Sequence, residues 1–222
     1  MMSVDLDRNV VLRGELELVE RAGRLFSACE EFACAATDLK TWALPGFRER
    51  LIAERHRIDP PPAAFKLYSP AALADEESER HLVELARAGL RVRICPAPLP
   101  HETIIVDRRV AILAGPASGG VREYTVVRSP GVVKGVVSLY RATWETAVEL
   151  AEYRRDRPPA LSEESRRILR MLGDGLKDEA AARRLGMSLR TYRRRVAEIL
   201  TLLDAGSRFQ AGIRAHEFGL LG

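Results

Sequence analysis

Three consecutive arginines near the C-terminal end, Arg193, Arg194 and Arg195, are the residues of this chain best suited to chemistry. A guanidinium group is always charged and carries five N–H donors, which fit phosphate oxygens and the acceptor edge of guanine. Adjacent arginines also repel one another unless an anion compensates them, and Glu198 is the acidic residue nearest to the run. We therefore expect this stretch to bind an anionic polymer, DNA in particular.

The distribution of charge supports this expectation. Residues 161–222 contain 12 Lys and Arg against 8 Asp and Glu, whereas residues 1–160 contain 23 of each, so the whole net charge of +4 lies in the C-terminal segment. A localised basic face is typical of a phosphate-binding surface. The alternative is that the charges belong to the solvated face of a surface helix.

A helix must position these arginines, and the residues that would begin and aim it are present. Gly186 suits the left-handed conformation that ends one helix, and Ser188 can cap the next. At 100° per residue, Tyr192 and Val196 share an apolar face that lies opposite Arg194. The pattern predicts a helix that packs on a small core while its far side enters a major groove.

Three further helices are expected around it, over residues 162–172, 176–185 and 207–215. Ser162 and Ser207 stand where N-terminal caps belong, and Gly173-Asp174-Gly175 interrupts the first helical pattern. Residues 161–222 are therefore predicted to form a small all-α domain of four helices.

This segment resembles the helix-turn-helix domain of LuxR-type (GerE-like) regulators. The matching residues are Leu161-Ser162, Leu169, Leu172, Asp174-Gly175-Leu176, Ala182, Leu185-Gly186, Thr191, Val196 and Ser207-Arg208. The resemblance implies a sequence-specific transcription regulator that binds double-stranded DNA. It also implies that the third helix reads the groove and that the fourth contributes to a homodimer.

The resemblance further implies which residues contact DNA. The candidate contacts are Arg193, Arg194 and Ala197 on bases, Lys177, Thr191 and Arg195 on the backbone, and Ser188 and Arg190 beside them. Two positions depart from the family pattern, because Ala180 replaces the usual Glu and Tyr192 replaces a small aliphatic residue. Since Ala197 has no long hydrogen-bonding side chain, sequence readout is expected to depend on Arg193 and Arg194.

Upstream, helical and strand periods alternate, which favours an α/β domain with a mixed sheet and flanking helices. Helices are expected over residues 11–29, 46–57, 71–88 and 131–153, and strands over residues 31–37, 63–68, 91–95, 103–106, 110–113 and 124–127, with a hairpin turn at Asp107-Arg108-Arg109. Because Pro158 and Pro159 cannot continue a helix, residues 154–160 are predicted to link a domain of residues 1–153 to that of residues 161–222.

The strand-turn-strand pattern of residues 91–113 resembles the phospholipase-D-like fold found in TrmB-like sensory domains of regulators. Phospholipase D chemistry uses two His-x-Lys motifs, in which one histidine attacks phosphorus and the other protonates the leaving group. This chain offers His101-Glu102-Thr103, and no second His-x-Lys occurs at His56, His81 or His216. We therefore expect a catalytically degenerate domain and no enzyme. The alternative is a phosphodiesterase or nuclease that the C-terminal domain targets to DNA.

A phosphate cleft without its chemistry could still bind a small anionic ligand or a protein partner. The candidate ligand residues are Arg91, Arg93, His101 and Arg128. Each has a plainer alternative, because arginines at strand ends are usually solvated or salt-bridged and a lone histidine is more often a surface residue than a ligand site. The apolar face of residues 131–153 could also support self-association, with half-sites about 10 base pairs apart.

The remaining composition excludes several classes of protein. No apolar run approaches the roughly 18 residues of a membrane span, and no signal-peptide pattern begins the chain, so a cytoplasmic protein is expected. Cys29, Cys34 and Cys95 form no Cys-x-x-Cys pair and are expected to be buried and free. Cys95 and His101 lack further ligands at a recognisable spacing, so neither a metal nor a cofactor is expected.

Overall fold

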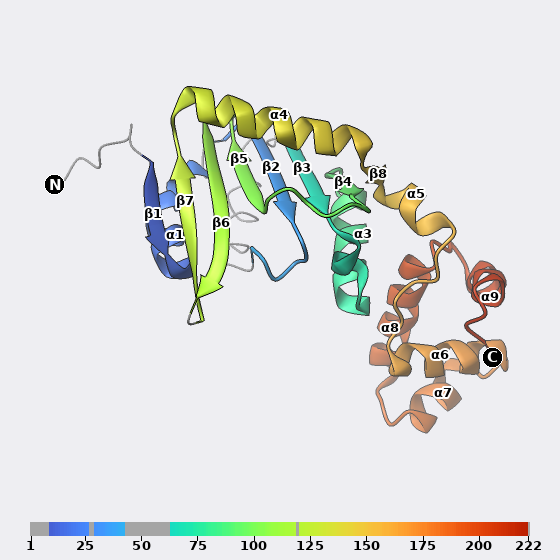
Figure 1. The fold of residues 1–222 in the computed structure, drawn as a ribbon. Helices are drawn as coiled ribbons and strands as arrows, with labels where there is room; N and C mark the ends of the chain where they lie inside the picture. Colours follow the sequence, from blue (N-terminus) through green and yellow to red (C-terminus); the bar gives the residue numbers. More distant parts are fainter. Residues whose placement is uncertain (1–8, 27–28, 43–62, 119, 222) are drawn as a thin grey trace. The chain divides into compact units, whose positions relative to one another are not determined.

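The computed structural model describes residues 9–26, 29–42, 63–118 and 120–221 (Figure 1). The chain divides into two compact units. Unit 1 comprises Met1–Ala71 with Leu90–Glu149, and unit 2 comprises Ala72–Gly89 with Leu150–Gly222. The helix expected over residues 46–57 lies outside the described residues. The mixed α/β architecture predicted for the N-terminal part is present in unit 1.

The described residues of unit 1 form an eight-stranded sheet in the order β1-β7-β6-β5-β2-β3-β4-β8. The strands are β1 Val10–Arg13, β2 Glu31–Ala36, β3 Ala63–Tyr68, β4 Arg91–Ile94, β5 Thr103–Val106, β6 Val110–Ser118, β7 Val121–Val127 and β8 Val148–Glu149. Strand β3 lies parallel to β2 and β4, and the other neighbours are antiparallel. The sheet is therefore mixed.

The central strands are continuous apolar runs because the sheet is covered. All four residues of β5 are buried, as are five of the six in β2. Helix α4, Pro130–Thr146, runs along one face of the sheet (Figure 1). Its Tyr140 packs with Ala33, Leu67 and Ile105, and its hydroxyl donates to the carbonyl of Phe65 at 3.1 Å. Helix α1, Gly14–Ala22, and the 3-10 turn η1, Gly23–Leu25, follow β1.

The predicted hairpin turn between β5 and β6 is confirmed. Asp107 and Arg108 have φ angles of 51° and 56°, and the amide of Arg109 donates to the carbonyl of Val106 at 3.0 Å. Two successive residues with positive φ are typical of the tight turns that match strand twist. The carboxylate of Asp107 also accepts the amide of Glu31 at 2.8 Å, which ties the turn to the beginning of β2.

At the two edges of the sheet, the structure differs from two of the predicted helices. The helix predicted over residues 131–153 ends at Thr146, because Ala147 is extended and Val148–Glu149 pairs with β4 as β8. The helix predicted over residues 11–29 begins later, because Val10–Arg13 pairs with β7. In both places a neighbouring strand supplies backbone partners that a local helical pattern does not reveal.

Unit 2 is helical. Its helices are α3 Glu76–Arg87, α5 Leu150–Arg155, α6 Glu163–Gly173, α7 Asp178–Arg184, α8 Leu189–Leu202 and α9 Arg208–Glu217, and the 3-10 turn η2 Pro70–Leu73 precedes α3. Helices α6 to α9 lie where the sequence predicts them and share one core around Ile168, Leu169 and Tyr192. Helix α5 extends into the segment that was expected to be a linker.

Helix α3 differs from its expected place. It follows β3 and precedes β4 in the chain, and the sequence pattern assigns it to the N-terminal domain. Its side chains instead pack in unit 2, where it contacts α8. The cause lies in its acidic residues, because Glu76 and Glu79 both find their partners in the segment after Leu150.

Candidate functional site

The turn between α7 and α8 has the chemistry expected of it. Gly186 adopts a φ of 68°, in the region that favours glycine. The hydroxyl of Ser188 accepts the amide of Thr191 at 3.1 Å and so caps α8. Ser162 and Ser207 cap α6 and α9 in the same way. The start of α8 is therefore fixed by local hydrogen bonds.

Helix α8 has two distinct faces. Tyr192 is 0% exposed and Val196 3% exposed, so both belong to the core as predicted. On the other side, the side chains of Arg193 and Arg194 are 60% and 63% exposed. The further exposed candidates are Arg190 and Ala197 on α8, Ser188 before it, and Lys177 before α7, while Thr191 is partly buried. The fold thus presents a row of arginines from a helix whose opposite face is anchored.

Asp178, at the start of α7, organises two of the basic side chains of unit 2. Its carboxylate accepts from Arg208 Nη1 at 2.7 Å and Nη2 at 3.0 Å, and from Arg193 Nε at 3.1 Å. The hydrogen bonds from Arg208, and then those from Arg193, hold the pKa of Asp178 below its usual value. Asp178 therefore orients Arg193 while leaving it exposed. The sequence marks it merely as an acid in a first helical turn.

Arg195 lies differently from its two neighbours. Its side chain is 32% exposed, and it pairs with Glu198 at 3.0 Å and with Glu164 at 3.1 Å. The hydrogen bond to Glu198 raises the pKa of Arg195 further. Glu198 also pairs with Arg80 of α3 and with Arg194. Carboxylates of the protein thus compensate much of the arginine run, and Arg195 faces the protein rather than an open surface.

The contacts of α3 explain why it belongs to unit 2. Glu79 is 3% exposed and accepts from Arg154 Nε at 2.7 Å and from the amide of Ala160 at 2.8 Å. Glu76 accepts the amide of Ser162 and the hydroxyl of Ser165 at the start of α6. Burial opposes ionisation of Glu76, yet the hydrogen bonds from Ser162 and Ser165 outweigh it and lower its pKa. These two carboxylates therefore hold α3 to the N-terminal end of α6 and to the segment that precedes it.

The four predicted ligand residues of unit 1 do not converge. A cavity of about 240 Å³ lies between the sheet and α4, and His101 contributes to its lining. Arg93 instead pairs with Glu149 at 2.9 Å and lies 4.9 Å from the ring of Trp144. Arg91 lies over the ring of Phe65, and the backbone of Arg128 binds Asn9. Arg91 and Arg93 thus make contacts within the protein, which fits the alternative that they are structural residues and do not bind a ligand.

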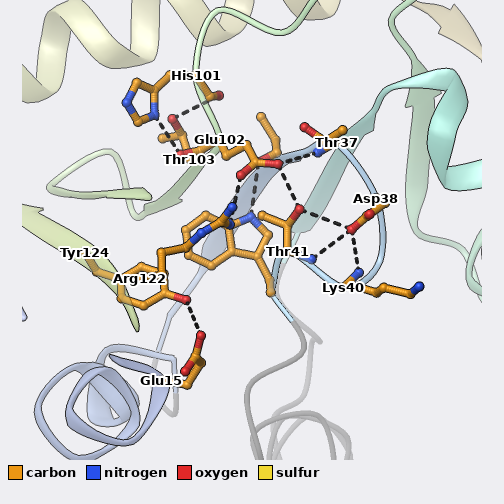
Figure 2. Close-up of polar contacts among 12 residues, drawn as sticks. Glu15, Thr37, Asp38, Lys40, Thr41, His101, Glu102, Thr103, Arg122 and Tyr124 are labelled. Carbon is orange, nitrogen blue, oxygen red and sulfur yellow. Dashed lines mark hydrogen bonds and ion pairs between the residues drawn. The ribbon is translucent and has the colours of Figure 1, made fainter. Parts of the chain in front are cut away.

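The residue after His101, Glu102, does not line this cavity, and its carboxylate has polar partners of its own (Figure 2). The carboxylate of Glu102 accepts the amide of Thr37 at 3.0 Å, the hydroxyl of Thr41 at 2.8 Å and Arg122 Nη1 at 3.0 Å. Burial raises the pKa of Glu102, but the hydrogen bonds from Thr37 and Thr41 and the charge of Arg122 outweigh it, so the pKa is lowered. Glu102 is therefore an ionised and well-partnered carboxylate that ties β5 to the residues after β2 and to Arg122 of β7.

The described residues also lack the second histidine that a phosphohistidine mechanism needs at this cavity. His81 and His216 belong to unit 2, and His56 lies outside the described residues. Thr103 occupies the position where the catalytic motif has a lysine, and it is buried in β5. Among the described residues, the cavity is therefore lined by a single histidine, His101, and by no lysine.

Replacing Glu102 by Gln is expected to lower the free energy of unfolding by about 1–2 kcal/mol at neutral pH, because hydrogen bonds to a charged group are lost. The pKa of Glu102 is lower in the folded protein than its unfolded value of about 4.3, so its ionisation stabilises the folded protein at pH values above about 4.3. This stabilisation is lost as the pH falls through the folded pKa. The difference between wild type and Glu102→Gln should therefore shrink below about pH 4. Urea unfolding at several pH values measures it.

Glu123→Gln is the matched control for this change. Glu123 is an exposed carboxylate that pairs with Arg13 at 3.1 Å, and its loss should change stability by less than about 0.5 kcal/mol at every pH. A pH-independent difference for Glu102→Gln would contradict the role of its charge.

The remaining sequence predictions concern cysteines, metals and membranes. Cys29, Cys34 and Cys95 are buried free thiols, as predicted, and burial raises the pKa of Cys34 to about 11. Across the described ranges, no group of three or more His, Cys, Asp or Glu side chains is arranged to hold a metal ion. The described helices include none with the length and apolar character of a membrane span.

Comparison with known proteins by sequence gives a relative that is described as a regulatory protein. The chain is 34% identical over 141 residues to the bialaphos biosynthetic pathway regulatory protein of Streptomyces hygroscopicus. The match covers 64% of this chain and 55% of that protein, so the chain spans about half the length of this curated relative. No protein-family model matches the chain.

Solved structures give more distant likenesses. TrmBL2, an archaeal chromatin protein described as showing a novel mode of DNA binding, matches with a TM-score of 0.50 at 14% identity, over 66% of this chain and 55% of that one. Nuc, a phospholipase D family member from Salmonella typhimurium, matches with a TM-score of 0.47 at 13% identity, over 64% and 98% of the two chains. The likeness to TrmBL2 concerns the fold alone, and it agrees with the TrmB-like fold expected for the N-terminal part.

Proposed function

We propose that this protein is a sequence-specific transcription regulator that binds double-stranded DNA through α8. The observation that carries the proposal is the exposed row of Arg190, Arg193 and Arg194 on a helix whose opposite face is fixed by Tyr192 and Val196. The 34% identity to a pathway regulatory protein supports the same function. A regulator of this kind works in the cytoplasm, where its DNA is.

In this proposal α7 and α8 form a LuxR-type helix-turn-helix. Arg193 and Arg194 read base edges, and Ala197 leaves room for a thymine methyl group. The sugar-phosphate backbone of the DNA is approached from the same side of the domain by Lys177, Ser188, Arg190 and Thr191. The sequence predicts that Arg195 contacts the DNA backbone. We assign it a different role, because Glu164 and Glu198 compensate its charge. It positions α8 against α6 and does not primarily contact phosphate.

In this proposal unit 1 binds a ligand or a protein partner and does not catalyse a reaction. Among the described residues, the cavity that His101 lines holds neither a second histidine nor a lysine, and this argues against phosphodiester cleavage. A metal-free assay with a chromogenic phosphodiester separates this from the rival function, a targeted phosphodiesterase. Turnover that His101→Ala abolishes would establish the rival instead.

Genome-wide footprinting of the intact protein tests DNA binding itself. Discrete protected sites are expected, with two half-sites whose centres lie about 10 base pairs apart if the protein binds as a homodimer. Protection of single half-sites would show that the protein does not bind DNA as a homodimer. Uniform protection without preferred sequence would contradict sequence-specific regulation.

A further inference from the structure

We propose that unit 2 contains a binding site for a small organic anion with an apolar body, such as a medium-chain carboxylate or alkyl phosphate. The site is a cavity of about 480 Å³ lined from α3, α5, the C-terminal ends of α8 and α9, and the segment around Arg157. Small-molecule sites commonly measure about 300–1,000 Å³. All lining residues belong to unit 2, and none of the residues that line the cavity in unit 1 takes part.

The apolar part of the cavity comes from well-packed residues. Val83, Leu150, Leu202 and Leu203 line it, and each is at most 6% exposed. Phe218, just after α9, adds an aromatic side chain. These side chains are held by the core of unit 2, so the apolar surface exists before any ligand arrives. A preformed apolar wall with a few charged groups is typical of a small-molecule site.

The charged part of the cavity is almost entirely positive. Five arginines line it, Arg87, Arg154, Arg155, Arg157 and Arg214, against one acid, Asp204. Arg154 is compensated by Glu79, whereas Arg87 lies 3.7 Å from Asp204 and Arg214 lies 3.4 Å from Glu217. The latter two pairs are largely solvent-exposed and therefore weak. Positive charge thus remains available on this wall.

Arg155 and Arg157 carry most of that charge. In the part of the chain that the structure describes, no carboxylate pairs with either one. Arg157 lies over the ring of Tyr153 at 5.7 Å, with Nη2 3.5 Å from the carbonyl of Leu73, and Arg155 is exposed. A guanidinium group binds a carboxylate or phosphate through two parallel hydrogen bonds. The anionic end of a ligand is therefore expected at Arg155 and Arg157, with its apolar end towards Leu202.

The same arginines could in principle meet a DNA phosphate. The sugar-phosphate backbone, however, has no group that would fill the space lined by Val83, Leu202 and Phe218. An amphipathic anion uses both walls, so the combination of charge and apolar surface favours it. The site does not depend on the proposed DNA binding, because it shares no residue with the exposed arginine row of α8.

Calorimetric titration of the full chain at constant ionic strength tests the proposal with four probes: sodium octanoate, octyl phosphate, octanol and inorganic phosphate. We expect octanoate or octyl phosphate to saturate one site with a Kd at least about 10-fold below those of octanol and inorganic phosphate. The stronger of the two amphiphiles identifies the headgroup. Octanol reports apolar contact alone, and inorganic phosphate reports charge alone.

Three variants locate the site. Arg155→Gln combined with Arg157→Gln should raise the Kd of the better amphiphile at least about 10-fold, and Arg155→Gln alone about 3-fold. Arg155 is exposed and makes no ion pair within the described chain, so its single substitution should leave the fold intact. Arg167→Gln removes the same charge from the exposed side of α6 and should leave the Kd unchanged.

Four outcomes would overturn the proposal: no saturable binding of either amphiphile, octanol binding as tightly as both, inorganic phosphate binding as tightly as both, or unchanged affinity in the Arg155 and Arg157 variants. The third would identify a general phosphate-binding surface. DNA binding is measured separately, so failure here leaves the proposed regulator function untouched.

Discussion

Glu79→Gln should lower the free energy of unfolding of unit 2 by about 3 kcal/mol, because it leaves the guanidinium of Arg154 buried without its counter-ion. The side chains of this pair are 4% and 12% exposed, and they meet at 2.7 Å. Buried pairs cost about 3–5 kcal/mol when one partner is lost. The amide of Gln keeps one oxygen for the backbone of Ala160, which places the expected loss at the lower end. Urea unfolding followed by far-UV circular dichroism measures it.

Glu84→Gln is the matched control on the same helix. Glu84 is exposed and lies 3.8 Å from Arg80, so its substitution should cost less than about 0.5 kcal/mol. Adding Arg154→Met to Glu79→Gln should recover part of the loss, because the unpaired charge is removed. A loss below about 1 kcal/mol for Glu79→Gln, or no recovery in the double variant, would show that α3 is not held in unit 2 by this pair.

The second large effect concerns DNA. Arg193→Ala and Arg194→Ala should each weaken binding to the preferred site by about 1–3 kcal/mol and reduce its preference over a scrambled duplex. Both side chains are exposed, and Asp178 orients Arg193 through its Nε. Fluorescence anisotropy with both duplexes, at two salt concentrations, measures affinity and preference together.

Two further variants separate base reading from charge. Lys177→Ala should weaken both duplexes equally and reduce the slope of affinity against salt by up to about one unit. Arg167→Ala, on the exposed side of α6, should change neither. If Arg193→Ala and Arg194→Ala weakened the two duplexes equally, they would be phosphate contacts and the readout would lie elsewhere.

The success of sequence reasoning depended on how local the cause was. The cap at Ser188, the turn at Gly186 and the core positions Tyr192 and Val196 follow from neighbours within a few residues, and the structure has each of them. The hairpin turn at Asp107 is local in the same sense. These features could be predicted because the residues that cause them adjoin them in the chain.

The features that sequence reasoning missed have distant causes. Strands β1 and β8 exist because β7 and β4 offer backbone partners, although their own residues continue a helical pattern. The place of α3 depends on Glu79, whose partner Arg154 lies 75 residues further along the chain. Arg93 was a ligand candidate, but Glu149, 56 residues away, neutralises it. Charge pairing at such separations has no local signature.

The position of α3 in the chain also constrains the order of folding. Residues 72–89 are synthesised early, yet their partners Arg154 and Ser162 emerge after the whole of Leu90–Glu149. Unit 1 can close as soon as β8 is made, whereas unit 2 must then close a loop of that length, a step that slows folding. Until then the buried face of α3, with Leu82 and Val83, has nothing of its own unit to cover it. Nascent chains should therefore pass through a stage in which the sheet is complete while the apolar face of α3 is still uncovered.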